Sequence, residues 1–199
     1  MARPRRFTDE EILAATQSCI LEHGPSVSTT MIAEKLGISQ AALFKRFGTK
    51  EQMIIGALRQ PMQRNPVADL LALGPSDEPI RTQLIALGMA MIRVMRRVVP
   101  CMAMLHAAGL KLESDERNDE RPPIQARRLL VAWLQHAIDD GRLKSVDPHV
   151  VAVSFIGMLH ARPFREIIVG DTDLKCSDEE YVTQLVNHLM DGIAVVEET

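Results

Sequence analysis

The stretch GISQAALFKRFGTKE, Gly37 to Glu51, decides the fold of this 199-residue chain. Together with the segment TTMIAEKL before it, it places apolar residues at helical spacing on both sides of a Gly-Ile-Ser turn, with serines where helices are capped. This pattern predicts two short helices, at about Thr29 to Leu36 and Gln40 to Phe47. Helices of eight residues are marginal alone, so they persist only when packed against a neighbour.

A longer helix precedes this stretch and can supply that neighbour. Thr8 and Glu11 stand in the T-x-x-E relation of a capping box, and the apolar pattern then runs through Ile12 and Ile20 to Gly24. A fourth helix is expected behind Thr49. If both short helices lay their apolar faces on the first helix, the start of the second short helix stays free, which is the arrangement of a helix-turn-helix.

The rest of the chain also predicts helices, because period-two runs of β-branched and aromatic residues do not occur. We therefore expect an all-α protein of about nine helices, with a domain change near Gln60. The domains are then residues 1–60, a helix-turn-helix domain, and 61–199, a larger helical domain. The Pro-rich segment 61–79 is expected to be bent or partly irregular, and Pro100, Pro123 and Pro148 suit first helical turns. Helices are expected at about 79–97, 100–112, 122–140, 148–167 and 178–196.

Charge is unevenly distributed along a chain whose formal net charge is −3. Residues 1–60 hold eight Lys and Arg against six Asp and Glu, whereas residues 61–199 hold 15 against 20. A basic N-terminal domain followed by an acidic second domain would give this distribution. The chain lacks a run of about 18 apolar residues and the apolar segment of a signal peptide, so we expect a soluble protein of the cytoplasm.

Enzyme and cofactor signatures are absent from the sequence. It shows no acid and base constellation, no Gly-rich phosphate loop and no complete set of metal ligands, so we expect no enzymatic activity and no cofactor. Cys101 with His106, or His136 with Asp139 and Asp140, could begin a metal site but lack further ligands at helical spacing. The three cysteines are widely spaced, which fits buried thiols in a reducing compartment.

The free face of the second short helix suits DNA. Gln40 can give and accept hydrogen bonds at an adenine edge, alanines allow close approach to thymine methyl groups, and Lys45 and Arg46 can reach phosphates or guanines. Thr49 and Lys50, with the free N–H groups of the next helix, can hold a phosphate. The clustered positive charge therefore has a plausible partner in DNA.

The segment SVSTTMIAEKLGISQAALFKRFGTKEQM resembles the DNA-binding region of the tetracycline-repressor (TetR) family, and GRLKSVDPHVVAVSFIGMLH is similar to the start of that family's penultimate helix. Phe44 stands where the family usually has Tyr, so a phenolic contact to phosphate is lost. As alternatives, Thr29, Ser39 and Thr49 can be helix caps, the basic side chains can be solvated, and Arg3, Arg5 and Arg6 can be either a tail or a DNA-contacting arm. The resemblance implies DNA contacts by Thr29, Thr30, Ser39, Gln40, Ala41, Ala42, Phe44, Lys45, Arg46, Thr49 and Lys50.

The second domain is expected to dimerise and to bind an effector. Specific binding normally couples two DNA-binding modules, and the last two helices carry broad apolar faces suited to a four-helix interface through Val153, Ile156, Leu185, Leu189 and Ile193. The resemblance implies a small-molecule effector that releases DNA, and an adaptable lining is offered by Met91, Met95, Met102, Leu105, His106, Trp133 and Phe155. All these residues can instead be internal core. The alternatives to an effector-released repressor are a metal- or redox-responsive regulator of the same fold, or a helical adaptor protein without DNA binding.

Overall fold

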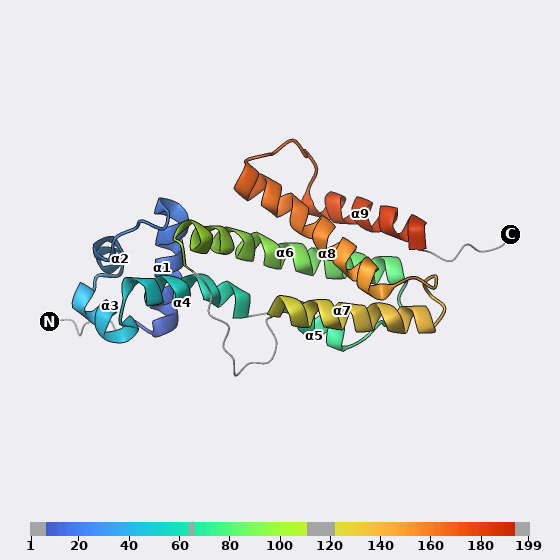
Figure 1. Ribbon diagram of the computed structural model, residues 1–199, viewed down its shortest axis with the longest axis horizontal. Helices are drawn as coiled ribbons and strands as arrows, with labels where there is room; N and C mark the ends of the chain where they lie inside the picture. Colours follow the sequence, from blue (N-terminus) through green and yellow to red (C-terminus); the bar gives the residue numbers. More distant parts are fainter. Residues whose placement is uncertain (1–6, 64–65, 111–121, 194–199) are drawn as a thin grey trace. The chain divides into compact units, whose positions relative to one another are not determined.

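The protein is all-helical in the part of the chain that the computed structural model describes, residues 7–63, 66–110 and 122–193 (Figure 1). Of residues 62, 63, 122 and 193 only the backbone is described. No helix within these ranges is both long and apolar enough to cross a membrane. The α-helices are α1 Asp9–His23, α2 Thr29–Leu36, α3 Gln40–Phe47, α4 Lys50–Gln63, α5 Pro66–Ala72, α6 Ile80–Ala107, α7 Pro122–Asp139, α8 Pro148–Phe164 and α9 Asp178–Ile193.

The chain divides into two compact units. The first comprises Met1–Arg64 and Pro100–Ser114, and the second comprises Asn65–Val99 and Asp115–Thr199. In the first unit, α2 and α3 have the bounds that the sequence predicts, and the capping box of Thr8 and Glu11 opens α1 as expected. Helix α6 contributes residues to both units.

The core of the first unit holds the two short helices in place. Ile32 of α2 and Leu43 of α3 are almost completely buried, and they share one apolar cluster with Ile12 and Ile20 of α1. The cluster also takes Leu58 from α4. Burial of a Leu or Ile side chain contributes roughly 1.5–3 kcal/mol, which is what two-turn helices require from their surroundings.

Gly37 sets the turn between α2 and α3. Its backbone is left-handed, with φ 65° and ψ 33°, and the Ile38 N–H donates to the carbonyl of Ala33 at 3.0 Å. A side chain at residue 37 would be strained in this conformation. Ser39 then begins α3, because its hydroxyl accepts from the Ala42 N–H at 3.2 Å.

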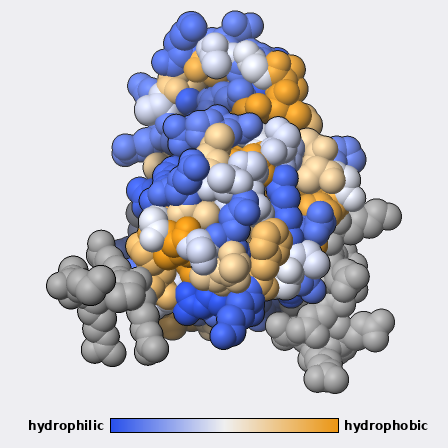
Figure 2. Space-filling model, turned by 90° about the vertical axis from the view of Figure 1, so that its left-hand side faces the viewer, coloured by the Kyte–Doolittle hydropathy of each residue, from blue (hydrophilic) through white to orange (hydrophobic). Residues whose placement is uncertain are grey.

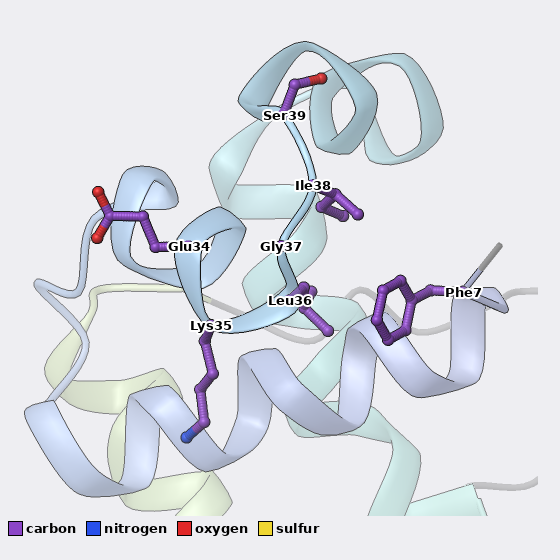
Figure 3. Close-up of a pocket in the computed structure, with 7 residues that line it drawn as sticks. All are labelled: Phe7, Glu34, Lys35, Leu36, Gly37, Ile38 and Ser39. Atoms are coloured by element: carbon purple, nitrogen blue, oxygen red, sulfur yellow. The ribbon is translucent and has the colours of Figure 1, made fainter. Parts of the chain in front are cut away.

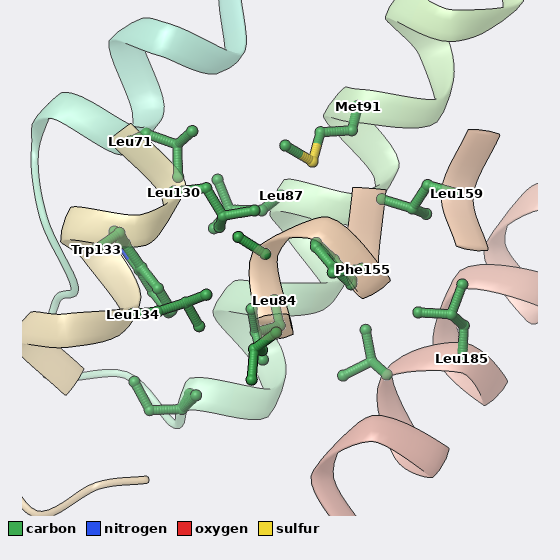
Figure 4. Packing of buried hydrophobic residues seen from close by; sticks show 14 of the residues in the cluster. Leu71, Leu84, Leu87, Met91, Leu130, Trp133, Leu134, Phe155, Leu159 and Leu185 are labelled. Carbon is green, nitrogen blue, oxygen red and sulfur yellow. The ribbon is translucent and has the colours of Figure 1, made fainter. Parts of the chain in front are cut away.

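A large apolar cluster fills the second unit (Figure 4). Leu84 of α6, Leu134 of α7 and Phe155 of α8 are each about 1% exposed, and Val182 of α9 is fully buried. Gly88 allows α6 and α9 to approach closely, because a Cβ there would lie 2.7 Å from Val182 Cγ1. The predicted helical periodicity of this half of the chain therefore produces one continuous core.

The predicted helix start at Pro100 is wrong, because α6 runs through this residue as one helix to Ala107. Pro100 lacks an N–H for the carbonyl of Arg96, and such a loss inside a helix costs about 3 kcal/mol. Beyond it, Cys101 and Leu105 are 0% and 2% exposed and belong to the core of the first unit. Because α6 continues past Pro100, both side chains are buried. The free energy gained by burying them offsets the cost of the proline.

The Pro-rich segment is partly irregular, as predicted: α4 continues through Pro61 and Pro66 begins α5, whereas residues 73–79 are not helical. One further prediction needs correction. The helix predicted at 148–167 ends as α8 at Phe164 and continues as a π-helical turn, η1, Arg165–Val169. The Gly170 N–H closes this turn on the carbonyl of Arg165.

A cluster of charged residues ties α6, α8 and the start of α9 together. The guanidinium of Arg96 donates to both carboxylate oxygens of Asp178 at 2.6 Å and to Glu166 at 2.7 Å. Arg162, 6% exposed, adds contacts to Glu166 at 2.9 Å and Asp178 at 3.2 Å. Hydrogen bonds from Arg96 are the largest cause that lowers the pKa of both carboxyl groups, and Arg162 lowers it further.

We predict that Arg96→Ala lowers the free energy of unfolding at pH 7 by about 1–2 kcal/mol, because two carboxylates lose their strongest partner. Since Arg96 depresses the pKa of both carboxyl groups, its stabilisation is complete above their ordinary values of 4.5 and 3.8 and is lost as the pH falls through the depressed values. Thermal unfolding at pH 7 and pH 3 measures this difference.

The matched control is Arg93→Ala, which removes an exposed arginine from the same helix. It should change stability little at either pH. A deficit of Arg96→Ala that is equally large at pH 3 would contradict a role in ionised pairs.

Candidate nucleic-acid interface

Helix α3 presents a polar face because only one side of it is buried. Leu43 is 1% exposed and Phe47 is half-buried, and both point into the core of the first unit. Phe44, which directly follows Leu43, is 42% exposed, and Lys45 is exposed beside it. A two-turn helix anchored by one side thus offers its opposite side and its N-terminus to a partner.

The structure places the predicted DNA-contacting residues at the starts of α2 and α4 and along both turns of α3. Thr29 and Lys50 are half-buried at the first positions of α2 and α4, and Ala42 is half-buried in α3. The face that carries α2 and α3 is largely hydrophilic, with small separate apolar patches (Figure 2). The exposed members of the set are Thr30, Ser39, Gln40, Ala41, Phe44, Lys45, Arg46 and Thr49.

Helix capping accounts for two of the hydroxyl groups. Ser39 caps α3, and Thr49 forms a capping box with Gln52, in which each backbone N–H donates to the other side chain at 3.1 Å. Thr29 is not a cap, because Ser28 caps α2 through the Met31 N–H. The hydroxyl of Thr29 is therefore not used by the backbone of its own helix start.

Arg46 has partners within the chain that the sequence did not indicate. Its Nη1 donates to the carbonyl of Phe7 at 2.6 Å, and its Nε lies 3.1 Å from the carboxylate of Asp9. These contacts join α3 to the start of α1 across 37 or more residues of sequence, so no local pattern predicts them. They compete with the phosphate contact expected for Arg46. Arg3, Arg5 and Arg6 lie outside the described residues.

Gln40 also has partners that the sequence did not indicate. Its Nε2 donates to the hydroxyl oxygen of Thr29 at 3.1 Å and to that of Thr30. The amide therefore joins the first turn of α3 to the first turn of α2. Three of the expected DNA-contacting residues form one hydrogen-bonded group.

The start of α4 already holds a carboxylate. The pKa of Glu51 lies below its ordinary value because its own backbone N–H and the Thr49 hydroxyl donate to it, and Lys50 adds a smaller attraction. A phosphate at this helix start would share these donors with Glu51. Lys50 is then the group that offsets the negative charge of both.

Two family profiles match the chain. The sequence profile of bacterial regulatory proteins of the tetR family matches residues 12–57, and that of the AefR-like transcriptional repressor C-terminal domain matches residues 82–190, which is more than half of the chain. The chain belongs to the TetR family. Its fold and domains are those of a DNA-binding transcriptional regulator.

Solved structures of TetR-family regulators share the fold. A putative regulator from Mesorhizobium loti has 20% identity and a TM-score of 0.70, covering 94% of this chain and 96% of its own. A regulator from Haloarcula marismortui has 21% identity and a TM-score of 0.69, covering 94% and 98%. PfmR from Thermus thermophilus has 21% identity and a TM-score of 0.67, covering 90% and 97%. No curated protein matches the chain.

The residues expected to line the effector site of this TetR-family chain are divided between the cores and surfaces of the two units. Met91, Trp133 and Phe155 are buried in the core of the second unit (Figure 4). Met95 packs against that core. The remaining three belong to the first unit: Leu105 is buried in its core, Met102 is 47% exposed and His106 is exposed.

The residues expected at the dimer interface are also divided. Val153 is exposed and Ile156 and Leu189 are half-buried, so they are available to a partner. Leu185 is 7% exposed and belongs to the core of its own unit, because α9 packs this side inward. The side chain of Ile193 lies outside the described residues.

The pairs considered as metal ligands do not assemble in the described ranges. Cys101 is buried and its Sγ accepts from the amide of Gln17 at 3.3 Å, whereas His106 is exposed. His136 lies 3.6 Å from Asp140 on the surface. No group of three possible ligands gathers among the residues that the structure describes.

A hollow borders the turn of the TetR helix-turn-helix (Figure 3). The ring of Phe7 points toward the side chain of Leu36. Because Arg46 holds the Phe7 carbonyl, the same contact fixes this side of the hollow. Its lining consists of Phe7, Glu34, Lys35, Leu36, Gly37, Ile38 and Ser39.

We predict that Arg46→Ala lowers the salt dependence of DNA binding clearly less than Lys45→Ala does. Each phosphate contact contributes about 0.9 to the slope of log affinity against log salt, and the Arg46 charge is already paired with Asp9. Lys45, exposed on the same turn, is the matched control.

The same variant should lower the free energy of unfolding by about 0.5–1 kcal/mol, because the contacts to Phe7 and Asp9 are partly exposed. Titration at four salt concentrations and thermal unfolding measure the two effects. Equal slope changes for both variants would show that Arg46 leaves Asp9 to contact phosphate.

Proposed function

We propose that this TetR-family protein is a homodimeric repressor that binds a palindromic operator through α3 and is released by a small-molecule effector. The observation that carries the proposal is the exposed side of α3, on which Gln40 and two alanines are followed by the basic side chains of the last turn, while Leu43 anchors the helix from behind. Such a helix can enter a major groove. The match to a family described as transcriptional repressors supports repression.

The proposed dimer uses the outer face of α8. Val150, Val153 and Phe164 are 61%, 53% and 41% exposed and recur at helical spacing, with Gly157 exposed between them. Helix α9 packs beside α8, and Leu189 is half-buried there. We propose that these surfaces meet their copies around a two-fold axis, without Leu185.

The proposed effector site lies in the core of the second unit. Met91, Met95, Trp133 and Phe155 are its members, and Met102, Leu105 and His106 are not included. Because the surrounding cluster is apolar, an effector there should be largely apolar and should displace packed side chains. It must prefer the conformation whose recognition helices are wrongly spaced for DNA.

A metal- or redox-responsive regulator is the weaker alternative. Burial has the largest effect on the pKa of the Cys101 thiol and raises it, while the contact with Gln17 lowers it, so the reactive thiolate is disfavoured. An adaptor without DNA binding would leave the exposed basic turns of α3 and α4 without a role. Selecting bound fragments from the organism's own DNA, then adding candidate effectors, separates these functions.

We predict that Lys50→Ala weakens binding to operator and to scrambled DNA by the same factor and lowers the salt slope by roughly 1. The physical reason is that Lys50 offsets phosphate charge at the start of α4 and contacts no base. Fluorescence anisotropy at several salt concentrations measures both quantities. Lys175→Ala, which removes an exposed lysine of the second unit, is the control, and unequal losses on the two DNAs would contradict this role.

We predict that Val153→Glu converts the dimer into a monomer of 22.2 kDa in sedimentation equilibrium and abolishes tight operator binding. A buried carboxylate on the two-fold interface would face its own copy without a partner. Leu73→Glu places the same charge on a side chain that is 83% exposed, away from α8, and should leave the dimer intact. A dimeric Val153→Glu would refute this interface.

A further inference from the structure

The first turns of α2 and α3 are connected by one side chain. Gln40 is the first residue of α3, and Thr29 and Thr30 are the first two residues of α2. The Gln40 Nε2 lies 3.1 Å from the Thr29 hydroxyl oxygen and also donates to that of Thr30. All three residues are at least partly exposed, on the surface proposed to meet DNA.

These contacts change what Gln40 can offer to a base. A glutamine amide has two N–H donors and one carbonyl acceptor, and here both donors are directed to threonine hydroxyls. The carbonyl oxygen is the group left to meet DNA. The bidentate contact with adenine that the sequence suggests needs an N–H as well, so it requires the threonine contacts to break.

We propose that Thr29 and Thr30 are positioning residues, which hold Gln40 so that its carbonyl oxygen reads one exocyclic amino group in the major groove. This inference rests on the proposed DNA-binding function. In that groove only adenine N6 and cytosine N4 donate hydrogen bonds, whereas the guanine and thymine edges present acceptors. The threonines also order a side chain with three rotatable bonds before DNA arrives.

The same geometry couples base reading to backbone contact. Each threonine oxygen that accepts from Gln40 keeps its own O–H proton, which it can donate to a phosphate. When a threonine O–H donates to a phosphate, the direction of this O–H bond is fixed. The threonine oxygen then presents a lone pair to the Gln40 amide. The two threonines contribute no charge, so their loss should not alter the salt slope.

Modified bases test the donor and acceptor assignment. The base pair read by Gln40 is the one at which Gln40→Ala loses discrimination, and Gln135→Ala, an exposed helical glutamine of the second unit, is the control. At that pair, removing the exocyclic amino group, with purine for adenine or 2-pyrimidinone for cytosine, should weaken wild-type binding about tenfold. Replacing the purine with its 7-deaza form, which lacks the N7 acceptor, should change binding less than twofold.

Threonine variants test the positioning. The double variant Thr29→Val with Thr30→Val removes both acceptors at similar volume, and it should lose discrimination at that pair as fully as Gln40→Ala. The lost hydroxyl contacts to phosphate should weaken binding to operator and to scrambled DNA by the same factor, with the salt slope unchanged. Adding Gln40→Ala to it should have no further effect. Thr29→Ser with Thr30→Ser keeps both oxygens and should retain discrimination. Circular dichroism checks that each variant is folded.

The outcomes separate this inference from the proposed function. If the folded protein shows no salt-sensitive binding to any duplex, both are overturned. If it binds, the inference alone is overturned by a tenfold loss with the 7-deazapurine, by full discrimination in the valine double variant, or by full discrimination in Gln40→Ala. If the valine double variant does not fold, the serine double variant and the modified bases still test the inference.

Discussion

The whole DNA-binding end of this protein depends on burying one side of two helices that are too short to stand alone. Ile32 and Leu43 are 0% and 1% exposed, and they hold α2 and α3 against α1 and α4. Because each short helix has only one such anchored side, its other side remains polar and open. The core needs only one side of α3, and for this reason the polar side of the helix stays exposed as the candidate interface.

The same constraint explains why a proline lies within the longest helix. The first unit gains Cys101 and Leu105 from the end of α6, and both are buried in the cluster that contains Ile32 and Leu43. A break at Pro100 would have freed the helix from an unfavourable residue and removed these side chains from the core. The burial of Cys101 and Leu105 therefore outweighs the tendency of Pro100 to end the helix.

Sequence patterns predicted the elements whose signals are local. The bounds of α2 and α3 and the capping box of α1 follow from residues at most a few positions apart, so they could be read directly. Contacts between distant residues could not be read in this way. The pairing of Arg46 with Asp9 and the inward side of α9 at Leu185 depend on how helices pack. The division of α6 between two units, with Met91 in one and Met102 in the other, depends on packing in the same way. A helical stripe shows which residues are apolar but does not say which neighbour covers them.

Internal partners shape the candidate interface as much as exposed charge does. Arg46 is held by Asp9, Gln40 by two threonines, and the start of α4 by the carboxylate of Glu51. Each of these contacts must be kept, shared or exchanged when a duplex arrives, and each alternative has a different consequence. A kept contact fixes which atom of the side chain can read DNA, whereas an exchanged contact costs the energy of the lost partner. Selectivity at this surface therefore depends on which internal contacts survive binding, and a list of its polar residues alone would not reveal it.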